Sequence, residues 1–285
     1  MANPRQSVPE NLPGDFFVDA TCIDCDACRQ IAPRTFAAGT ETAFVHQQPQ
    51  QVDVVRDAVH ALLACPTGSI GCLGDVDVKS HLNDFPLLVD GTVYYCGFNS
   101  PKSFGGNSFF VRRPDGNWLV DAPKFQASLV RQLESLGGID KIFLTHQDDV
   151  ADAADYAAHF GAQRIIHRLE LDAQPEAELV LEGTERVELA AGCIALPTPG
   201  HTAGHCCLLM DDLYLFTGDH LYWDREAAHL AAFPDHCWYS WPEQIRSMQR
   251  LCRERFEWVL PGHGQRVHRP AEELQQQLEL LIEAM

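Results

Sequence analysis

Three cysteines crowd into the segment TCIDCDAC near the N-terminus, and a fourth follows at a distance. Cys22, Cys25 and Cys28 form a C-x2-C-x2-C run, and Cys65 comes much later, directly before Pro66. A short loop with three thiolates can wrap one face of a cubane cluster, while a remote thiolate closes the other side. A four-cysteine zinc site more usually has two C-x2-C pairs. The odd total of 11 cysteines argues against a fully paired disulfide framework. The spacing therefore favours an iron–sulfur cluster.

Over residues 14–78 the chain resembles the bacterial-type ferredoxins. Their pattern is C-x2-C-x2-C-x3-C-P, in which the fourth cysteine serves a second cluster. Here Ala32 stands at that fourth position and Pro33 keeps the proline. The resemblance implies a small α+β ferredoxin-like domain with one 4Fe–4S cluster. Cys72 is left over and is interpreted as a small buried apolar residue, with a place beside the cluster as the alternative. A helix is predicted over residues 51–63, where apolar residues recur at helical spacing. The implied cluster ligands are Cys22, Cys25, Cys28 and Cys65.

Three short motifs later in the chain carry metal-competent side chains. TPGHTAGH contains His201, LFTGDH contains Asp219 and VLPGHG contains His263. Each motif follows an apolar strand and places one such side chain on a turn. A catalytic metal with open coordination positions needs ligands held in this way. Because a lone histidine in a loop is usually just solvated, the prediction rests on all three motifs in this order, after THQDD.

The segment 96–285 is similar to the metallo-β-lactamase superfamily, and residues 79–95 look like the junction before it. This resemblance implies an α/β fold, the four-layer αββα sandwich, with a metal site on one edge of its two sheets. Family members use a motif H-x-H-x-D-H, then a histidine in a PGH turn, a bridging aspartate in TGD and a histidine in a final GHG turn. The matching residues are His146, His201, Asp219 and His263.

The first motif departs from the family pattern. Asp148 stands where the second histidine would be, and Ala151 replaces the third. In one interpretation Asp148 coordinates, and Asp152, one helical turn further on, supplies the missing acid. In the other, the second metal position is degraded and one metal binds well. Asp149 is either a ligand or a helix-start acid favoured by the helix dipole, and the second interpretation is preferred.

The predicted site follows from these matches. Asp219 and Asp152 are the predicted catalytic residues. Asp121, which closes the strand WLVDAP, matches an acid that braces the site through hydrogen bonds. The aromatic-rich segment 220–241 is expected to wall a substrate pocket or an interdomain contact, with plain packing as the alternative. The predicted metal ligands are His146, Asp148, His201, Asp219 and His263.

Composition limits the partners of the chain. Its 285 residues, 46% of them hydrophobic, suit one large domain plus a small one. The net charge of −19 and the absence of a basic stripe argue against binding to nucleic acid or anionic membranes. The N-terminus lacks the apolar core of a signal peptide, so we expect a cytoplasmic protein without a membrane segment. The acidity also suits a basic redox partner protein.

We expect a metal-dependent hydrolase acting on a small-molecule substrate, with one 4Fe–4S cluster and one or two divalent metals, zinc or iron. The first alternative is a di-iron or mono-iron oxidoreductase that receives electrons from the ferredoxin-like module. The carboxylate of Asp148 is a harder ligand than imidazole and favours iron or manganese over zinc. The second alternative is a redox-sensing binding protein with a degraded metal site. The hydrolase ranks first by analogy with the family.

Overall fold

The computed structural model describes residues 2–285, and the chain divides into two compact units. The first comprises the chain up to Asn117 together with Ala122–Ile139, and the second comprises Trp118–Asp121 together with Asp140–Met285. The first unit therefore includes the whole predicted ferredoxin-like segment and extends beyond it. The proposed limits of the segments 14–78, 79–95 and 96–285 stay a prediction.

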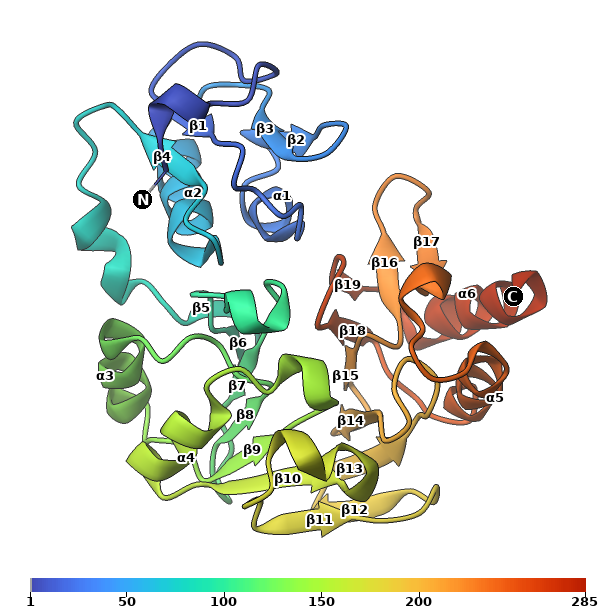
Figure 1. Cartoon of the computed structure of the whole chain (residues 1–285). Helices are drawn as coiled ribbons and strands as arrows, with labels where there is room; N and C mark the ends of the chain where they lie inside the picture. Colours follow the sequence, from blue (N-terminus) through green and yellow to red (C-terminus); the bar gives the residue numbers. More distant parts are fainter. Residues whose placement is uncertain (1) are drawn as a thin grey trace. The chain divides into compact units, whose positions relative to one another are not determined.

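The first unit begins with a small α+β segment (Figure 1). Strand β1 pairs antiparallel with β4, and β2 pairs antiparallel with β3. The helix predicted over residues 51–63 is confirmed as α2, whose Ala58, Val59 and Ala61 are fully buried in the core of this segment. The elements are η1 (Pro4–Gln6), β1 (Phe16–Val18), α1 (Ala27–Ile31), β2 (Phe36–Ala38), β3 (Ala43–Val45), α2 (Val52–Ala64) and β4 (Ile70–Cys72).

The remainder of the first unit begins with η2 and contains the antiparallel strands β5, β6 and β7. The loop after β6 is bonded to the end of α2, because the Asn99 N–H donates to the Ala64 carbonyl at 3.2 Å. The last carbonyls of a helix lack intrahelical donors, so this bond satisfies one of them. The Asn99 side chain then donates to the Gly105 carbonyl at 2.6 Å. The elements are η2 (Val78–Asn83), β5 (Leu87–Asp90), β6 (Val93–Tyr95), η3 (Pro101–Ser103), β7 (Phe109–Val111) and α3 (Ala127–Ser135).

The second unit contains strands of two sheets. Strands β8, β9, β10 and β11 are parallel neighbours, and the other sheet has six strands in the order β12-β13-β14-β15-β18-β19. The strands are β8 (Trp118–Val120), β9 (Lys141–Phe143), β10 (Gln163–His167), β11 (Leu179–Leu181), β12 (Val187–Ala190), β13 (Cys193–Pro197), β14 (Cys206–Met210), β15 (Tyr214–Gly218), β18 (Trp258–Pro261) and β19 (Val267–His268). A separate hairpin is formed by β16 (Tyr222–Asp224) and β17 (His229–Ala231).

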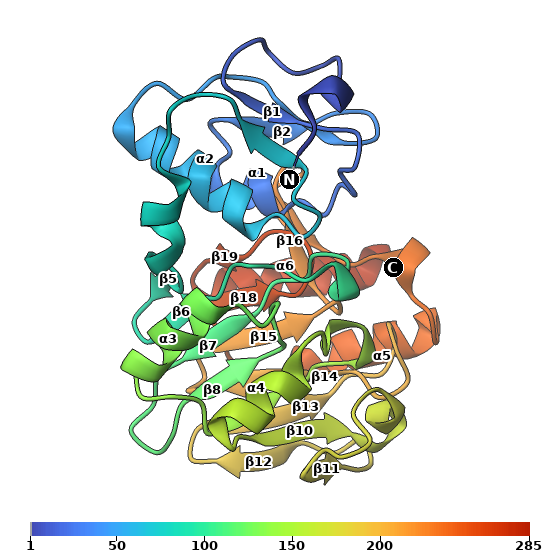
Figure 2. The same cartoon turned by 60° about the vertical axis from the view of Figure 1, so that its left-hand side comes forward.

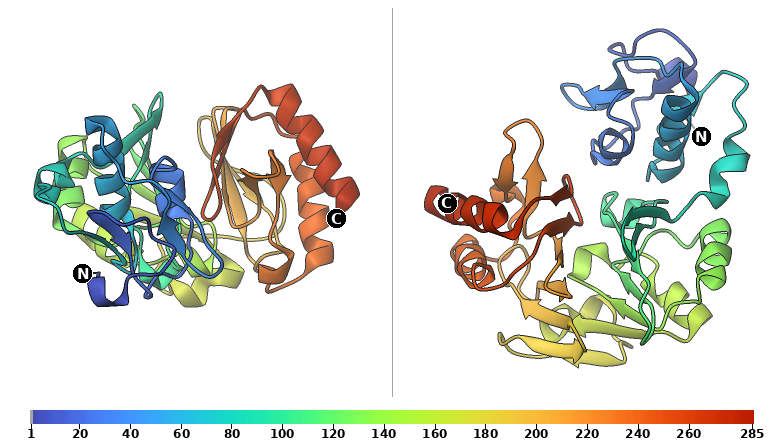
Figure 3. Two further views of the ribbon diagram at one scale, coloured as in Figure 1. Left: turned by 90° about the horizontal axis from the view of Figure 1, so that it is seen from above. Right: turned by 180° about the vertical axis from the view of Figure 1, so that it is seen from behind.

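Helices cover the outer faces of these sheets. α4 packs on β10 (Figure 2), and α5 and α6 lie together on the six-stranded sheet (Figures 1 and 3). Every residue of β14 and β15 is buried, as expected for strands covered on both faces. The predicted αββα class is therefore confirmed. The helices are η4 (Gln147–Asp149), α4 (Ala153–Phe160), η5 (Arg168–Ala173), η6 (Pro234–His236), α5 (Trp241–Leu251) and α6 (Ala271–Ala284).

The C-terminal helix α6 buries one apolar face. Pro270 is its N-cap residue, and Leu274 and Leu278 lie fully buried against the six-stranded sheet. Residues four apart fall on one face of a helix, so these leucines form the stripe that α6 buries. Within residues 2–285, none of the helices combines the length and apolar character needed to cross a bilayer.

Candidate metal centre

Side chains from four loops of the second unit meet at the ends of its strands. His146 follows β9, His201 lies between β13 and β14, Asp219 follows β15 and His263 follows β18. Two overlapping groups result. In each group the nitrogen and oxygen atoms that could bind a metal all lie within 4.8 Å of one another. The groups are His146, His201 and Asp219, and Asp149, Asp219 and His263.

Asp219 is the side chain that the two groups share. Its Oδ2 lies 3.8 Å from His146 Nε2 and 3.7 Å from His201 Nε2, and its Oδ1 lies 2.8 Å from His263 Nδ1. One carboxylate therefore faces three imidazoles through two different oxygens. This is the geometry that a bridging acid between two cations requires. The role of these residues as metal ligands stays a prediction.

Asp148 lies at the more exposed side of the first group. Its Oδ2 is 3.4 Å from His201 Nε2 and 3.9 Å from His146 Nε2. The close approach of His201 outweighs burial and holds the pKa of Asp148 below its usual value. Asp152, by contrast, is the N-cap residue of α4, half-buried, and belongs to neither group. The geometry places Asp148 beside the imidazoles, and a catalytic role for Asp152 stays a prediction.

Asp149 belongs to the second group of potential ligands. It lies before α4, which begins at Ala153, and it is the last residue of the short helix η4 and an acid of its first turn. Its role as a ligand stays a prediction. Its carboxylate is buried, and neither oxygen has a hydrogen-bond partner among residues 2–285. Burial first, and then the nearby Asp219, raises its pKa well above the usual value.

Gly262 makes room for the carboxylates at this point. A Cβ atom at this position would lie 2.4 Å from Asp149 Oδ2 and 2.8 Å from Asp219 Oδ1, which is closer than real Cβ atoms approach. Steric room for the two carboxylates therefore explains why the first glycine of the VLPGHG motif is a glycine. Any side chain here would displace the two acids from the group that they form with His263.

The protonation states of His146 and Asp219 suit cation binding. Burial lowers the pKa of His146 to about 4, so its imidazole is neutral at neutral pH. Burial alone would raise the pKa of Asp219, but the surrounding imidazoles, His263 foremost, bring it below the usual value. Neutral imidazoles and ionised carboxylates are the forms that bind divalent cations. His146 Nε2 is moreover buried without a hydrogen-bond partner among the described residues, so the residues present fit a bound divalent cation.

Thr145 and Asp121 orient the ring of His146. Thr145 donates through its backbone N–H to Asp121 Oδ1 at 2.8 Å and through its hydroxyl to Oδ2 at 2.9 Å. Its hydroxyl oxygen also lies 3.0 Å from His146 Nδ1. Since the hydroxyl proton points to Asp121, this oxygen accepts the Nδ1 proton. The Nε2 lone pair is then directed at the group. Asp121 thus lies where the family resemblance placed a bracing acid.

Glu170 joins two of the loops that carry site residues. This buried carboxylate on η5 accepts from Gln147 N at 3.1 Å through Oε2 and from Gly204 N at 2.5 Å through Oε1. Gln147 follows His146, and Gly204 belongs to the TPGHTAGH loop. Sequence reasoning missed Glu170, and no motif marks it, because its function depends on which two loops meet in the fold.

Comparison with protein families agrees with this geometry. The family described as the 4Fe-4S single cluster domain of Ferredoxin I matches residues 18–72. The family described as the metallo-beta-lactamase superfamily matches residues 89–283. The chain belongs to the metallo-beta-lactamase superfamily. It carries a single-cluster ferredoxin domain in front, and the two families together imply an iron–sulfur cluster and a divalent metal.

Two curated relatives and one solved structure illustrate the range of the superfamily. The chain is 31% identical to a hydroxyacylglutathione hydrolase of Acidiphilium cryptum, over 48% of the chain and 51% of the relative. It is 30% identical to thioesterase pkgB of Emericella nidulans, over 50% of the chain and 45% of the relative. The chain thus spans about half the length of these relatives. A metallo-beta-lactamase from Hirschia baltica shares the fold, with a TM-score of 0.51 at 17% identity, over 69% of the chain and 96% of that protein.

The ferredoxin domain brings its four predicted cluster ligands around one cavity. Cys72 is not among the residues that line it, and its sulfur lies near the Gly74 carbonyl instead. Backbone N–H groups donate to two of the sulfurs, from Asp24 to Cys22 at 3.4 Å and from Ser69 to Cys65 at 3.3 Å. Hydrogen bonds to cysteine sulfur are usual around iron–sulfur clusters, so the residues present fit the cluster. The residues that line the cavity include Cys22, Cys25, Cys28 and Cys65.

Gly105 approaches this cavity from the loop after β6. A Cβ atom at this glycine would lie 2.9 Å from the Cys25 sulfur and 3.0 Å from Pro66 Cγ. Its φ of +88° is also in the region that favours glycine. Residue 105 lies within the span that matches the metallo-beta-lactamase superfamily. A loop of the part that matches the superfamily therefore packs directly on the segment that carries the predicted cluster ligands.

The aromatic segment 220–241 divides into packed and exposed parts. Tyr222 and Phe233 are stacked with ring centres 4.0 Å apart. Trp238 is 62% exposed, and its ring centre lies 6.1 Å from that of His201. The backbone N–H groups of Trp238 and Tyr239 also donate to the His201 carbonyl. Packing explains the first pair, and Trp238 is an exposed aromatic surface beside the metal centre.

Proposed function

We propose that this member of the superfamily is a metal-dependent hydrolase that cleaves acyl thioesters. The observation that carries the proposal is the position of Asp219 between two groups of potential metal ligands. The two curated relatives, named as a hydroxyacylglutathione hydrolase and a thioesterase, support the choice of substrate class. When bound, divalent cations would supply Lewis-acid chemistry and activate water for attack on a carbonyl.

The protein's own side chains would hold and orient the reacting groups. His146 and His201 would hold one cation, Asp149 and His263 a second, and Asp219 would contact both. The exposed ring of Trp238 would pack against the part of the substrate next to the carbonyl, because a flat apolar surface there excludes water without competing for the cations. Asp148, 44% exposed at its side chain, lies at the solvent side of this group.

The experiment uses full-length protein purified without oxygen, with its cluster intact. Hydrolysis of a panel of S-acyl thioesters is followed by the thiol released, and metal content is measured by mass spectrometry on the same samples. His201→Ala should lose the activity and the metal of the large domain while it keeps the iron of the cluster. His229→Ala, an exposed histidine on β17, is the matched control and should behave as wild type. Full metal and full activity in His201→Ala would refute the proposal.

A second candidate function is that of an iron-dependent oxidoreductase supplied with electrons by the ferredoxin domain. Two observations favour it: the carboxylate of Asp148 lies within 3.9 Å of both His146 and His201, and the chain carries a 4Fe–4S domain. A hard oxygen ligand favours iron or manganese over zinc. Metal analysis separates the candidates. Zinc with thioester cleavage supports the hydrolase, whereas iron beyond the cluster's own complement, without thioester cleavage, supports the oxidoreductase.

A further inference from the structure

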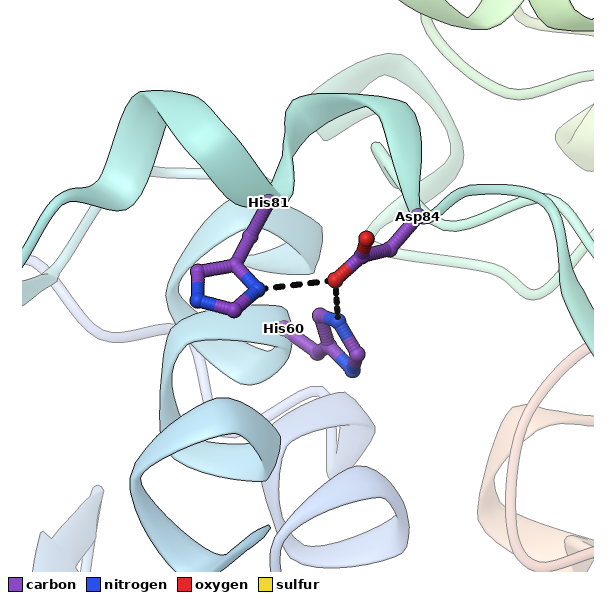
Figure 4. Close-up of side chains that lie close together, drawn as sticks. All are labelled: His60, His81 and Asp84. Carbon is purple, nitrogen blue, oxygen red and sulfur yellow. Dashed lines mark hydrogen bonds and ion pairs between the residues drawn. The ribbon is translucent and has the colours of Figure 1, made fainter. Parts of the chain in front are cut away.

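A second meeting of potential ligands occurs in the first unit, outside the cluster cavity. His60 lies on α2, whereas His81 lies on η2 and Asp84 is its C-cap residue. Both imidazoles point to the same carboxylate oxygen (Figure 4). His60 Nε2 lies 2.7 Å and His81 Nδ1 lies 2.8 Å from Asp84 Oδ2. The three ligand atoms lie within 4.8 Å of one another.

The three side chains differ in their exposure to solvent. His60 is 5% exposed, and Phe85 packs edge-on against its ring at 5.3 Å between centres. The side chain of His81 is 26% exposed and that of Asp84 is 36% exposed. A ring held this firmly by its neighbours presents Nε2 in a fixed direction. The two partly exposed side chains leave the other side of the group open to water.

The donor set suits a divalent transition metal. Zinc takes imidazole nitrogen and carboxylate oxygen at bonds of about 2.0 to 2.2 Å, which in a tetrahedral site places neighbouring ligand atoms roughly 3.3 to 3.6 Å apart. The two nitrogen–oxygen separations at Asp84, 2.7 and 2.8 Å, are shorter than this spacing, so a cation would replace the two hydrogen bonds after a small outward movement of the partly exposed His81 and Asp84 side chains. Two imidazoles with one carboxylate are borderline ligands that zinc and its neighbours in the first transition row accept. Water from the open side can complete the coordination.

We propose that His60, His81 and Asp84 form a second metal site, which binds a divalent transition-metal cation such as zinc. The site joins α2 to η2, which follows the ferredoxin domain in the sequence. The C-cap residue of α2 is Cys65, a predicted cluster ligand. A cation here would therefore stabilise the helix from which one side of the cluster is held. The same three side chains without a cation form only a hydrogen-bonded clasp, and the experiment below separates the two.

The test counts zinc in the full-length protein with its cluster in place. Samples are dialysed against a zinc buffer that fixes the free zinc concentration, and bound zinc is measured by mass spectrometry. Wild type should hold one equivalent more than His81→Ala, and the difference should be the same for Asp84→Asn. The Asp84→Asn variant keeps an oxygen that can accept hydrogen bonds, so loss of zinc in this variant reports on the metal rather than on the clasp.

His46→Ala is the matched control, since His46 is an exposed histidine of the same unit whose Nε2 lies 3.1 Å from the Pro33 carbonyl. It should retain the full wild-type zinc content. Added zinc should also raise the unfolding temperature of wild type by more than that of His81→Ala. Equal zinc content in wild type, His81→Ala and Asp84→Asn would overturn the proposal, as would a loss of zinc in His46→Ala equal to that in the other variants.

Discussion

Removal of the Glu170 carboxylate should loosen the metal centre without touching a ligand. Glu170 accepts one backbone N–H from each of two loops, at 3.1 Å from Gln147 and 2.5 Å from Gly204. A hydrogen bond to a charged group contributes about 1.5 to 3 kcal/mol, and a buried donor left unsatisfied costs a similar amount. Glu170→Ala removes both bonds, so the free energy of unfolding should fall by about 3 kcal/mol or more.

Glu170→Gln refines this prediction because it nearly conserves the volume. Its amide keeps one accepting oxygen but turns an NH₂ donor towards the other backbone N–H. One loop then keeps its bond while the other faces a donor, and the free energy of unfolding should fall by about 2 kcal/mol. Changes in residues that support metal ligands typically weaken metal binding about 10- to 100-fold. We expect a loss of zinc affinity in this range for the large domain.

The measurements are urea unfolding followed by tryptophan fluorescence and competition for zinc with a chelator of known affinity. Glu185→Gln makes the same chemical change at an exposed position and is the control. If Glu170→Gln and Glu170→Ala unfold at the same urea concentration as this control and bind zinc as tightly, the two hydrogen bonds do not hold the loops, and the reasoning is wrong.

Three further predictions follow from single positions. Cys65→Ser should lose cluster iron and visible absorbance whereas Cys72→Ser should keep both, and the reverse result would refute the ligand assignment. Gly105→Ala should disturb the cluster, because the new Cβ would meet a cysteine sulfur. Gly183→Ala is the control and should leave the cluster intact, because this glycine has a similar φ of +80° but nothing within 4 Å of an added Cβ. Equal iron content and absorbance in both variants would contradict the prediction. Asp148→His should gain zinc relative to iron when both metals are supplied in equal excess, and an unchanged metal ratio would show that Asp148 is not a ligand.

Local sequence patterns predicted much of the fold. Helix α2 was predicted from apolar residues at helical spacing, because the periodicity of a helix does not depend on its partners. The clustering of His201, Asp219 and His263 was also predictable. Each follows an apolar strand, and the family resemblance placed all three strand ends at one edge of the two sheets.

Only the tertiary structure shows which side chains from distant segments of the sequence lie together. The THQDD run left Asp149 as either a ligand or a helix-start acid, and only the approach of Gly262 and Asp219 shows that its carboxylate lies with those of the metal centre. No sequence motif marks Glu170, because its partners are backbone N–H groups, which every residue except proline has. His60 and Asp84 are 24 residues apart, and their contact exists because η2 packs on α2. The sequence determines which side chains could bind a metal. Burial and the contact between loops that are distant in the sequence determine which of these side chains form a site.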